Sequence, residues 1–167
     1  MKKLLILLFA FLYFNGLFAQ EKRASPLVEK TESIENIEVK LQYGETSMKG
    51  REVFGNLVPY GKLWRSGANE ATVIEFNKDV KLNGKLVKAG KYSLFTIPGE
   101  DKWIVIINRI WNQWGAYNYD ATKDVLRFEV ESKKVEKHDK LNLNLNKEGL
   151  IQLMWEETAI EFNLTKA

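Results

Sequence analysis

Two segments of the chain concentrate side chains that could hold a ligand. The first, residues 58–72, is punctuated by glycines and contains Trp64, Arg65, Asn69 and Glu70. A tryptophan ring offers a flat stacking surface, and an arginine offers a forked set of N–H donors. An amide both donates and accepts hydrogen bonds, whereas an ionised carboxylate only accepts them. These four side chains could together hold a polar ligand.

The same segment also admits a purely structural role. Trp64 could fill one end of the core, because buried tryptophans belong to a core more often than to a ligand platform. Arg65 and Glu70 could then form an internal ion pair that orders the loop. The sequence leaves both roles open.

The second segment, residues 111–120, holds four aromatic residues and three amides. Aromatic rings stack on the C–H face of a sugar while amides pair with its hydroxyl groups, but the same composition suits a turn packed against the core. The candidate ligand-binding residues here are Gln113, Trp114, Tyr117, Tyr119 and Asp120.

Two carboxylates in these segments, and one just after them, suggest hydrolysis as another hypothesis. Glu70 and Asp120 would act as general acid and base, with Arg65 stabilising negative charge and Asp124 as a further acidic candidate. Paired-carboxylate chemistry requires a separation of about 5–10 Å, which the sequence does not give. Because the chain has 22 acidic residues, a candidate pair by itself means little.

The residues that are missing exclude several classes of chemistry. The chain has no cysteine, which excludes thiol nucleophiles, thiolate zinc sites and iron–sulfur clusters. Its one histidine, His138, lies in a charged stretch, residues 133–140, that is typical of a solvated turn. We therefore expect no catalytic triad, no metal and no cofactor.

The first 19 residues have the layout of a secretory signal peptide. Two lysines precede an apolar run of 11 residues, which is too short to span a bilayer, and Ala19 offers a small residue for cleavage. Removing residues 1–19 leaves 148 residues, with 23 basic against 22 acidic groups. We expect an exported protein, periplasmic or secreted, with no membrane span and too little positive charge for nucleic acid.

The remaining sequence predicts one all-β domain. Residues 20–36 are polar and aperiodic, which predicts a flexible leader to a domain over 37–167. The period is two over residues 37–43 and 141–146, and Asn83-Gly84 predicts a tight hairpin over 80–87. Further strands are expected over 71–76, 91–97, 103–107 and 125–130. About eight such strands favour an antiparallel β-sandwich or a jelly-roll-like barrel.

Three irregularities qualify this pattern. Residues 103–107 are apolar at every position, which predicts a strand covered on both faces. The apolar parity changes across residues 156–159, which predicts a bulge or turn there. Residues 46–69 form a long loop with five glycines or prolines, and such loops in compact domains are usually either functional or wrongly assigned as loops.

The two candidate segments, and several stretches outside them, carry the motifs of a known family. The motifs are Met48 to Arg51 (MKGR), Leu57 to Thr72 (LVPYGKLWRSGANEAT), Ala89 to Glu100 (AGKYSLFTIPGE), Trp103, Gln113 to Tyr117 (QWGAY), Tyr119-Asp120 and Asp124 to Arg127 (DVLR). On these motifs the chain resembles the secreted bacterial family catalogued as domain of unknown function 2911 (DUF2911). The resemblance implies no established activity. It does imply which residues belong to the family pattern: Arg51, Trp64, Arg65, Gly67, Asn69, Glu70, Gln113, Trp114, Gly115, Tyr119 and Asp120.

Three functions remain open. The first is a non-catalytic binding module for a small polar or carbohydrate ligand, held by Arg51, Trp64, Arg65, Asn69, Trp114 and Tyr117. The second, ranked nearly level with it, is a structural or partner-binding envelope domain in which both aromatic segments are core. The carboxylate-dependent hydrolase ranks third.

Overall fold

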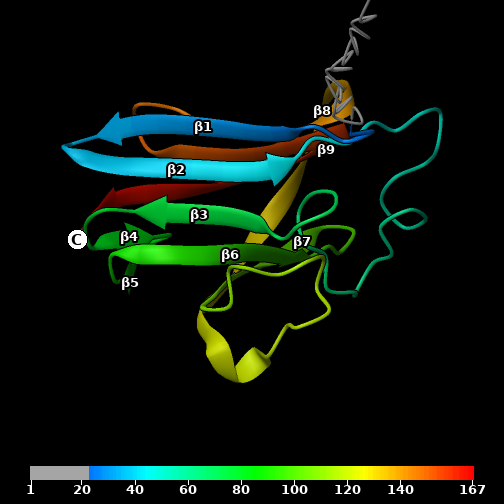
Figure 1. Cartoon of the computed structure of the whole chain (residues 1–167). Coiled ribbons are helices and arrows are strands. Elements are labelled where there is room, and N and C mark those ends of the chain that lie inside the picture. Colours follow the sequence, from blue (N-terminus) through cyan, green and yellow to red (C-terminus); the bar gives the residue numbers. More distant parts are fainter. Residues whose placement is uncertain (1–22) are drawn as a thin grey trace, which may run out of the picture.

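The described residues form nine strands in a single open antiparallel sheet, most of them with alternating apolar residues. The computed structural model describes residues 23–167, so the predicted signal peptide lies outside the described residues. The strands are β1 (Leu27–Ile34), β2 (Ile37–Gly44), β3 (Thr72–Phe76), β4 (Val80–Leu82), β5 (Lys85–Val87), β6 (Gly90–Ile97), β7 (Lys102–Asn108), β8 (Asp124–Leu145) and β9 (Leu150–Lys166), with one 3-10 turn, η1 (Ala121–Lys123). Their order in the sheet is β1-β2-β3-β6-β7-β8-β9-β4-β5 (Figure 1). The predicted all-β, antiparallel class is confirmed.

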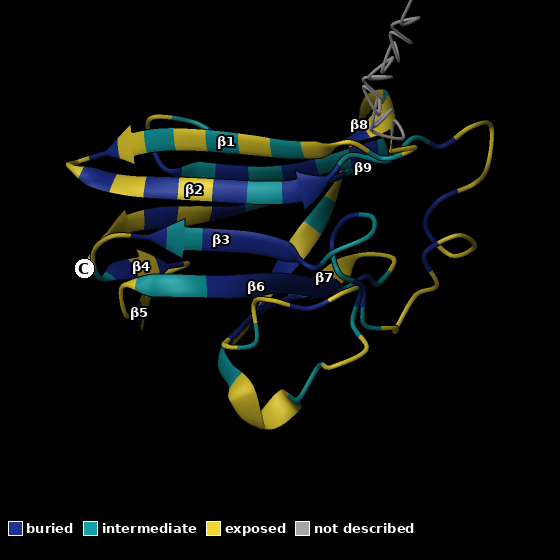
Figure 2. Ribbon diagram, in the orientation of Figure 1, coloured by how far each residue is buried: buried dark blue, intermediate teal, exposed yellow. Residues whose placement is uncertain are grey.

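The sheet folds back over itself around one large core. β8 pairs with β7 through Glu131 and with β9 from Ser132 onward, so it passes from one part of the sheet to the other. β9, β4 and β5 lie behind the face made by β1, β2, β3 and β6 (Figure 1). Inward residues from both parts form a continuous apolar cluster, and the alternation of buried and exposed positions is visible along β2 (Figure 2).

The predicted hairpin between β4 and β5 is confirmed. Asn83 and Gly84 both have positive φ, +47° and +78°, as a type I′ turn requires. The three residue pairs from Val80↔Val87 to Leu82↔Lys85 close the hairpin in the register that the sequence predicts.

Strand β1 lies in the segment for which the sequence predicts a flexible leader. It pairs with β2 along its whole length, from Leu27↔Gly44 to Ile34↔Ile37. Val28 and Ile34 on its inner face pack with the core, but the residues between them are polar, and Lys30 Nζ donates to Asn142 Oδ1 of β8 at 3.0 Å. Hydrophobic periodicity therefore gives no signal for this strand.

The charged stretch 133–140 is also part of a strand, so the predicted solvated turn at His138 is wrong. The β8–β9 register shifts on both sides of the His138↔Glu156 pair, and Glu156 has a left-handed φ of +56°. This irregularity confirms the break in parity expected across residues 156–159. Both faces of β8 are largely solvated here, which explains its charge.

Residues 103–107 are covered on both faces, as predicted. Trp103, Val105 and Ile107 point into the large core. Ile106 faces the other way, where it joins Phe95 in a smaller cluster beneath the loop that follows β7. That loop is thereby anchored to the sheet.

No helix among residues 23–167 is long and apolar enough to cross a membrane.

Candidate functional site

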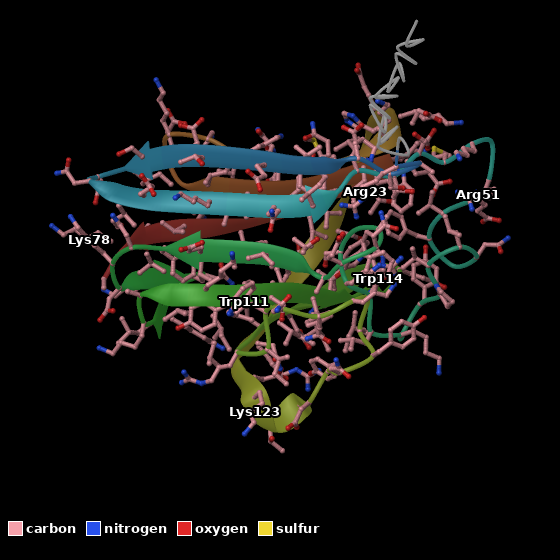
Figure 3. All side chains as sticks on the ribbon, viewed as in Figure 1. Arg23, Arg51, Lys78, Trp111, Trp114 and Lys123 are labelled. Carbon is pink, nitrogen blue, oxygen red and sulfur yellow. The ribbon has the colours of Figure 1, made fainter. Side chains whose placement is uncertain are left out.

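Two long loops meet at one end of the sheet and bring the two candidate segments, residues 58–72 and 111–120, together. Residues 45–71 connect β2 to β3, and residues 109–120 connect β7 to η1. The backbone N–H of Ala71 donates to Gln113 O at 3.0 Å, and the N–H of Gly115 donates to Asn69 O at 2.8 Å. Arg51 and Trp114 lie at the same end of the molecule (Figure 3). We call this region the loop end.

Trp64 anchors the first loop in the core, so its structural role is confirmed. Its ring is 8% exposed and stacks on Trp155, with centroids 5.9 Å apart and planes 20° apart. Phe54 and Trp103 pack edge-on against it. Backbone hydrogen bonds in both directions between Trp64 and Thr96, at 2.7 and 2.9 Å, fix the loop to β6.

A tight turn over residues 66–69 follows Trp64 and Arg65. Ser66 and Asn69 have left-handed φ angles of +54° and +65°. The turn lies directly on Gly44 at the end of β2. A Cβ atom added to Gly44 would lie 2.0 Å from the carbonyl oxygen of Ala68. Asn69 uses its amide to donate to Ser25 O at 3.2 Å, which makes it a residue that holds the turn in place.

Arg51, Trp64 and Arg65 line one cavity of about 240 Å³, together with Thr46 and Trp155. The guanidinium of Arg51 is oriented by its own loop: Nε donates to Met48 O at 2.9 Å and Nη2 donates to Ser47 O at 3.1 Å. The structure thus brings three of the predicted residues to one hollow whose wall is cationic and whose floor is aromatic.

Arg65 is half-buried without a counter-charge in residues 23–167. Its Nε is fully buried and has no hydrogen-bond partner in that range. Burial lowers the pKa of Arg65, and the Tyr117 phenol acts in the opposite direction. Tyr117 on the second loop is therefore an electrostatic neighbour of this cavity.

The predicted ion pair between Arg65 and Glu70 is wrong. Glu70 pairs with Arg23, with a separation of 2.5 Å between Nη2 and Oε2. Burial acts to raise the pKa of Glu70, but the hydrogen bond and charge of Arg23, with a backbone hydrogen bond, outweigh it and hold the pKa below its usual range. Arg23 lies in the predicted leader, so sequence reasoning missed this partner.

Trp114 and Tyr117 are exposed on the second loop. Their exposed fractions are 56% and 85%, and Gly115 between them has a left-handed φ of +61°. Trp111 is 40% exposed, but Lys91 covers its ring with Nζ at 4.2 Å from the centroid. Figure 3 shows Trp111 away from the loop end, along β6. Trp114 and Tyr117 are thus the exposed aromatic residues of the loop end on this segment.

Gln113 belongs to the scaffold of the second loop. The side chain is buried, and Nε2 donates to Ile110 O at 2.7 Å. Its Oε1 has no hydrogen-bond partner in residues 23–167. Gln113 therefore shapes the turn that presents Trp114.

Tyr119 and Asp120 also serve the scaffold. Tyr119 donates its hydroxyl hydrogen to Asp124 Oδ2 at 2.8 Å, and burial followed by this bond raises the pKa of Tyr119 to about 12. Asp120 caps η1 by accepting the N–H of Thr122 at 2.9 Å. Each carboxylate of the hydrolase hypothesis therefore has its own partner: Arg23 for Glu70 and Thr122 for Asp120. No observation here favours that hypothesis.

Two further residues of the site were not predicted. Thr46 opens the long loop outside every motif, and Trp155 lies on β9, far from both loops in sequence. The change in apolar parity just after Trp155 is a sequence signal at this point, where Glu156 has a left-handed φ of +56°.

Comparison with known proteins places the chain in a family without assigning it an activity. No curated protein and no solved structure matches the chain. A family model described as a protein of unknown function (DUF2911) matches residues 25–164, which include both loops, every predicted site residue and strand β1. The chain therefore belongs to the DUF2911 family.

Proposed function

We propose that this protein is an exported binding module that holds a small polar or carbohydrate ligand at the loop end. The observation that carries the proposal is the exposure of Trp114 and Tyr117 on a turn that is tied to the neighbouring loop. Trp64, Trp103 and Trp155 fill the core, but the core does not need these two rings. Exposed aromatic residues beside polar groups are typical of sites that bind sugars.

The arrangement fits the chemistry of a sugar ring. The apolar C–H face of a sugar would stack on Trp114 or Tyr117. Its hydroxyl groups would accept hydrogen bonds from Arg65, and they could donate to or accept from the hydroxyl group of Tyr117. The two loops are fixed by backbone hydrogen bonds, so little ordering entropy would be lost on binding.

Tryptophan fluorescence tests the proposal. A panel of neutral oligosaccharides should change the emission of the protein, and Trp114→Ala should abolish the change. Trp111→Ala is the matched control, because that ring is also partly exposed but lies under Lys91. A response that survives in Trp114→Ala but disappears in Trp111→Ala would refute the proposed site.

A further inference from the structure

The cavity beside Arg51 and Arg65 has a cationic wall with no acidic side chain in it. It lies between the start of the long loop and the turn over residues 66–69. Two arginines contribute to its lining, and no aspartate or glutamate does. A hollow with two positive charges and no internal anion has a positive potential that low-dielectric walls strengthen.

Three carboxylates around the loop end have partners other than the two arginines. Glu156 accepts the backbone N–H groups of Val53 and Phe54, with the shortest contacts at 3.3 Å. Glu45 pairs with Lys140 at 2.9 Å, and Glu70 pairs with Arg23. Within residues 23–167, neither Arg51 nor Arg65 forms an ion pair with any carboxylate, the adjacent Glu52 included.

Both guanidinium groups retain donors for a ligand. Arg51 uses two N–H groups to bind carbonyl oxygens, which fixes its orientation and leaves its other donors without an acceptor in the described chain. The Arg65 side chain makes no hydrogen bond in residues 23–167; because only its Nε is fully buried, its terminal N–H groups are the donors that a ligand can reach. An unpaired, half-buried cation costs desolvation energy that an anion would offset.

The rest of the cavity is aromatic and of suitable size. The stacked pair Trp64 and Trp155 lines it, and Thr46 adds a hydroxyl group to the lining. Its volume of about 240 Å³ exceeds the roughly 10–15 Å³ that a cavity needs to hold one water molecule, so an oxyanion and a small substituent fit. Arginine forks match the paired oxygens of carboxylate and phosphate groups.

We propose that this cavity is an anion-binding site that takes the carboxylate or phosphate group of a small molecule between Arg51 and Arg65. The proposal goes beyond binding of a neutral sugar to Trp114 and Tyr117, because neither ring lines the cavity and Arg65 is the one residue that the two sites share. An acidic sugar could occupy both, whereas free phosphate would occupy the cavity alone.

NMR titration of the full mature chain tests the site with three probes. Inorganic phosphate and glucuronate represent the two sources of the anion, and glucose is the neutral control. The Nε–H signal of Arg65 and the amide signals of Gly67 and Ala68, which line the cavity, should shift with phosphate, glucuronate or both. A response to one anion alone identifies its source. Absence of shifts with both anions overturns the proposal, and so do shifts with glucose that equal those with the anions and persist in Trp114→Ala, the variant that removes the sugar site.

Charge-removing variants provide the second arm. Arg65→Gln and Arg51→Gln should each weaken binding of the responding anion about tenfold or more, because each removes charge-assisted hydrogen bonds. Arg109→Gln is the matched control, since Arg109 is exposed and lies outside the cavity lining. Unchanged affinity in both cavity variants would contradict the site, and the wild-type Arg65 signal gives a result even if a variant fails to fold.

The two proposals fail separately. Trp114→Ala should leave phosphate binding unchanged, because that ring is absent from the cavity lining. If neutral oligosaccharides give no response but an anion shifts the Arg65 signal, the sugar proposal is wrong and the anion site stands. If neutral oligosaccharides change the fluorescence but neither anion shifts the Arg65 signal, the anion proposal is wrong and the sugar site stands.

Discussion

At the scale of single residues, the two loops contain chemically similar side chains with opposite roles. Trp64 and Trp114 both stand in polar, glycine-containing segments, and the sequence does not separate them. Their burial is decided by distant partners. Trp64 meets Trp155 from the other end of the chain, whereas Trp114 lies on the outer side of a turn held by Gln113 and Asn69.

This difference predicts unequal effects of two tryptophan substitutions on the free energy of unfolding. Trp64→Ala should lower it by about 3–5 kcal/mol, because it leaves a cavity among packed aromatic rings. Trp114→Ala should lower it by less than about 1 kcal/mol, since most of the ring is exposed. Urea unfolding measures both. Equal and large losses would mean that Trp114 is a core residue and that the structural hypothesis holds for both segments.

Tyr119 gives a prediction about alkaline pH. Its pKa in the folded protein is about 12, against an ordinary value of 10, so the phenol stays protonated to a higher pH in the folded state than in the unfolded state. The stabilisation is therefore fully present below pH 10 and is lost as the pH rises toward 12. Absorbance titration of tyrosinate should show a late component that Tyr119→Phe removes. A titration that is identical in that variant would contradict the Tyr119–Asp124 bond.

At the scale of elements, the contact between β2 and the turn over residues 66–69 positions the candidate site. A methyl group on Gly44 would collide with the backbone of Ala68, whereas one on Gly61 would meet nothing within 4 Å. Gly44→Ala should lower the free energy of unfolding by about 3 kcal/mol or more through this clash. Gly61→Ala should cost about 1 kcal/mol, through its left-handed φ alone. Urea unfolding compares them; a smaller loss in Gly44→Ala would mean that the turn moves freely.

Elements with a clear apolar face could be predicted from the sequence, and those without one could not. Alternation predicts β2, and the run of residues 103–107, apolar at every position, predicts β7. Asn83-Gly84 predicts the β4–β5 hairpin. β1 and the middle of β8 could not be predicted, because the Lys30 side of β1 faces amides of β8 and the charged stretch of β8 is wet on both faces. For such strands, pairing with neighbours replaces hydrophobic burial as the reason for the conformation.

At the scale of the whole molecule, the fold of the sheet creates the site from segments that are far apart in sequence. Every predicted site residue lies on one of the two loops, but only the fold shows that Arg51, Trp64 and Arg65 share a cavity. It also separates Tyr119 and Asp120 from the ligand set. Sequence motifs locate the loops, whereas side-chain partners such as Arg23 depend on tertiary contacts that no local pattern encodes.

The Arg23–Glu70 pair links the start of the described chain to the loop end, and we expect it to be weak. Both side chains are more than a third exposed, so solvent screens their attraction. Arg23→Ala should lower the free energy of unfolding by no more than about 1 kcal/mol. Urea unfolding at low and high salt checks this. A larger loss that persists at high salt would show that the pair holds the loop in place.

Whether the loop end binds a ligand can be measured by NMR of the wild-type protein during titration with the oligosaccharide that most strongly changes its fluorescence. We predict shifts of the Trp114 indole and of amides in residues 64–69 and 113–117, with the signals of the β4–β5 hairpin unchanged. Shifts centred on the hairpin, or no shifts with any member of the panel, would contradict a ligand site at the loop end.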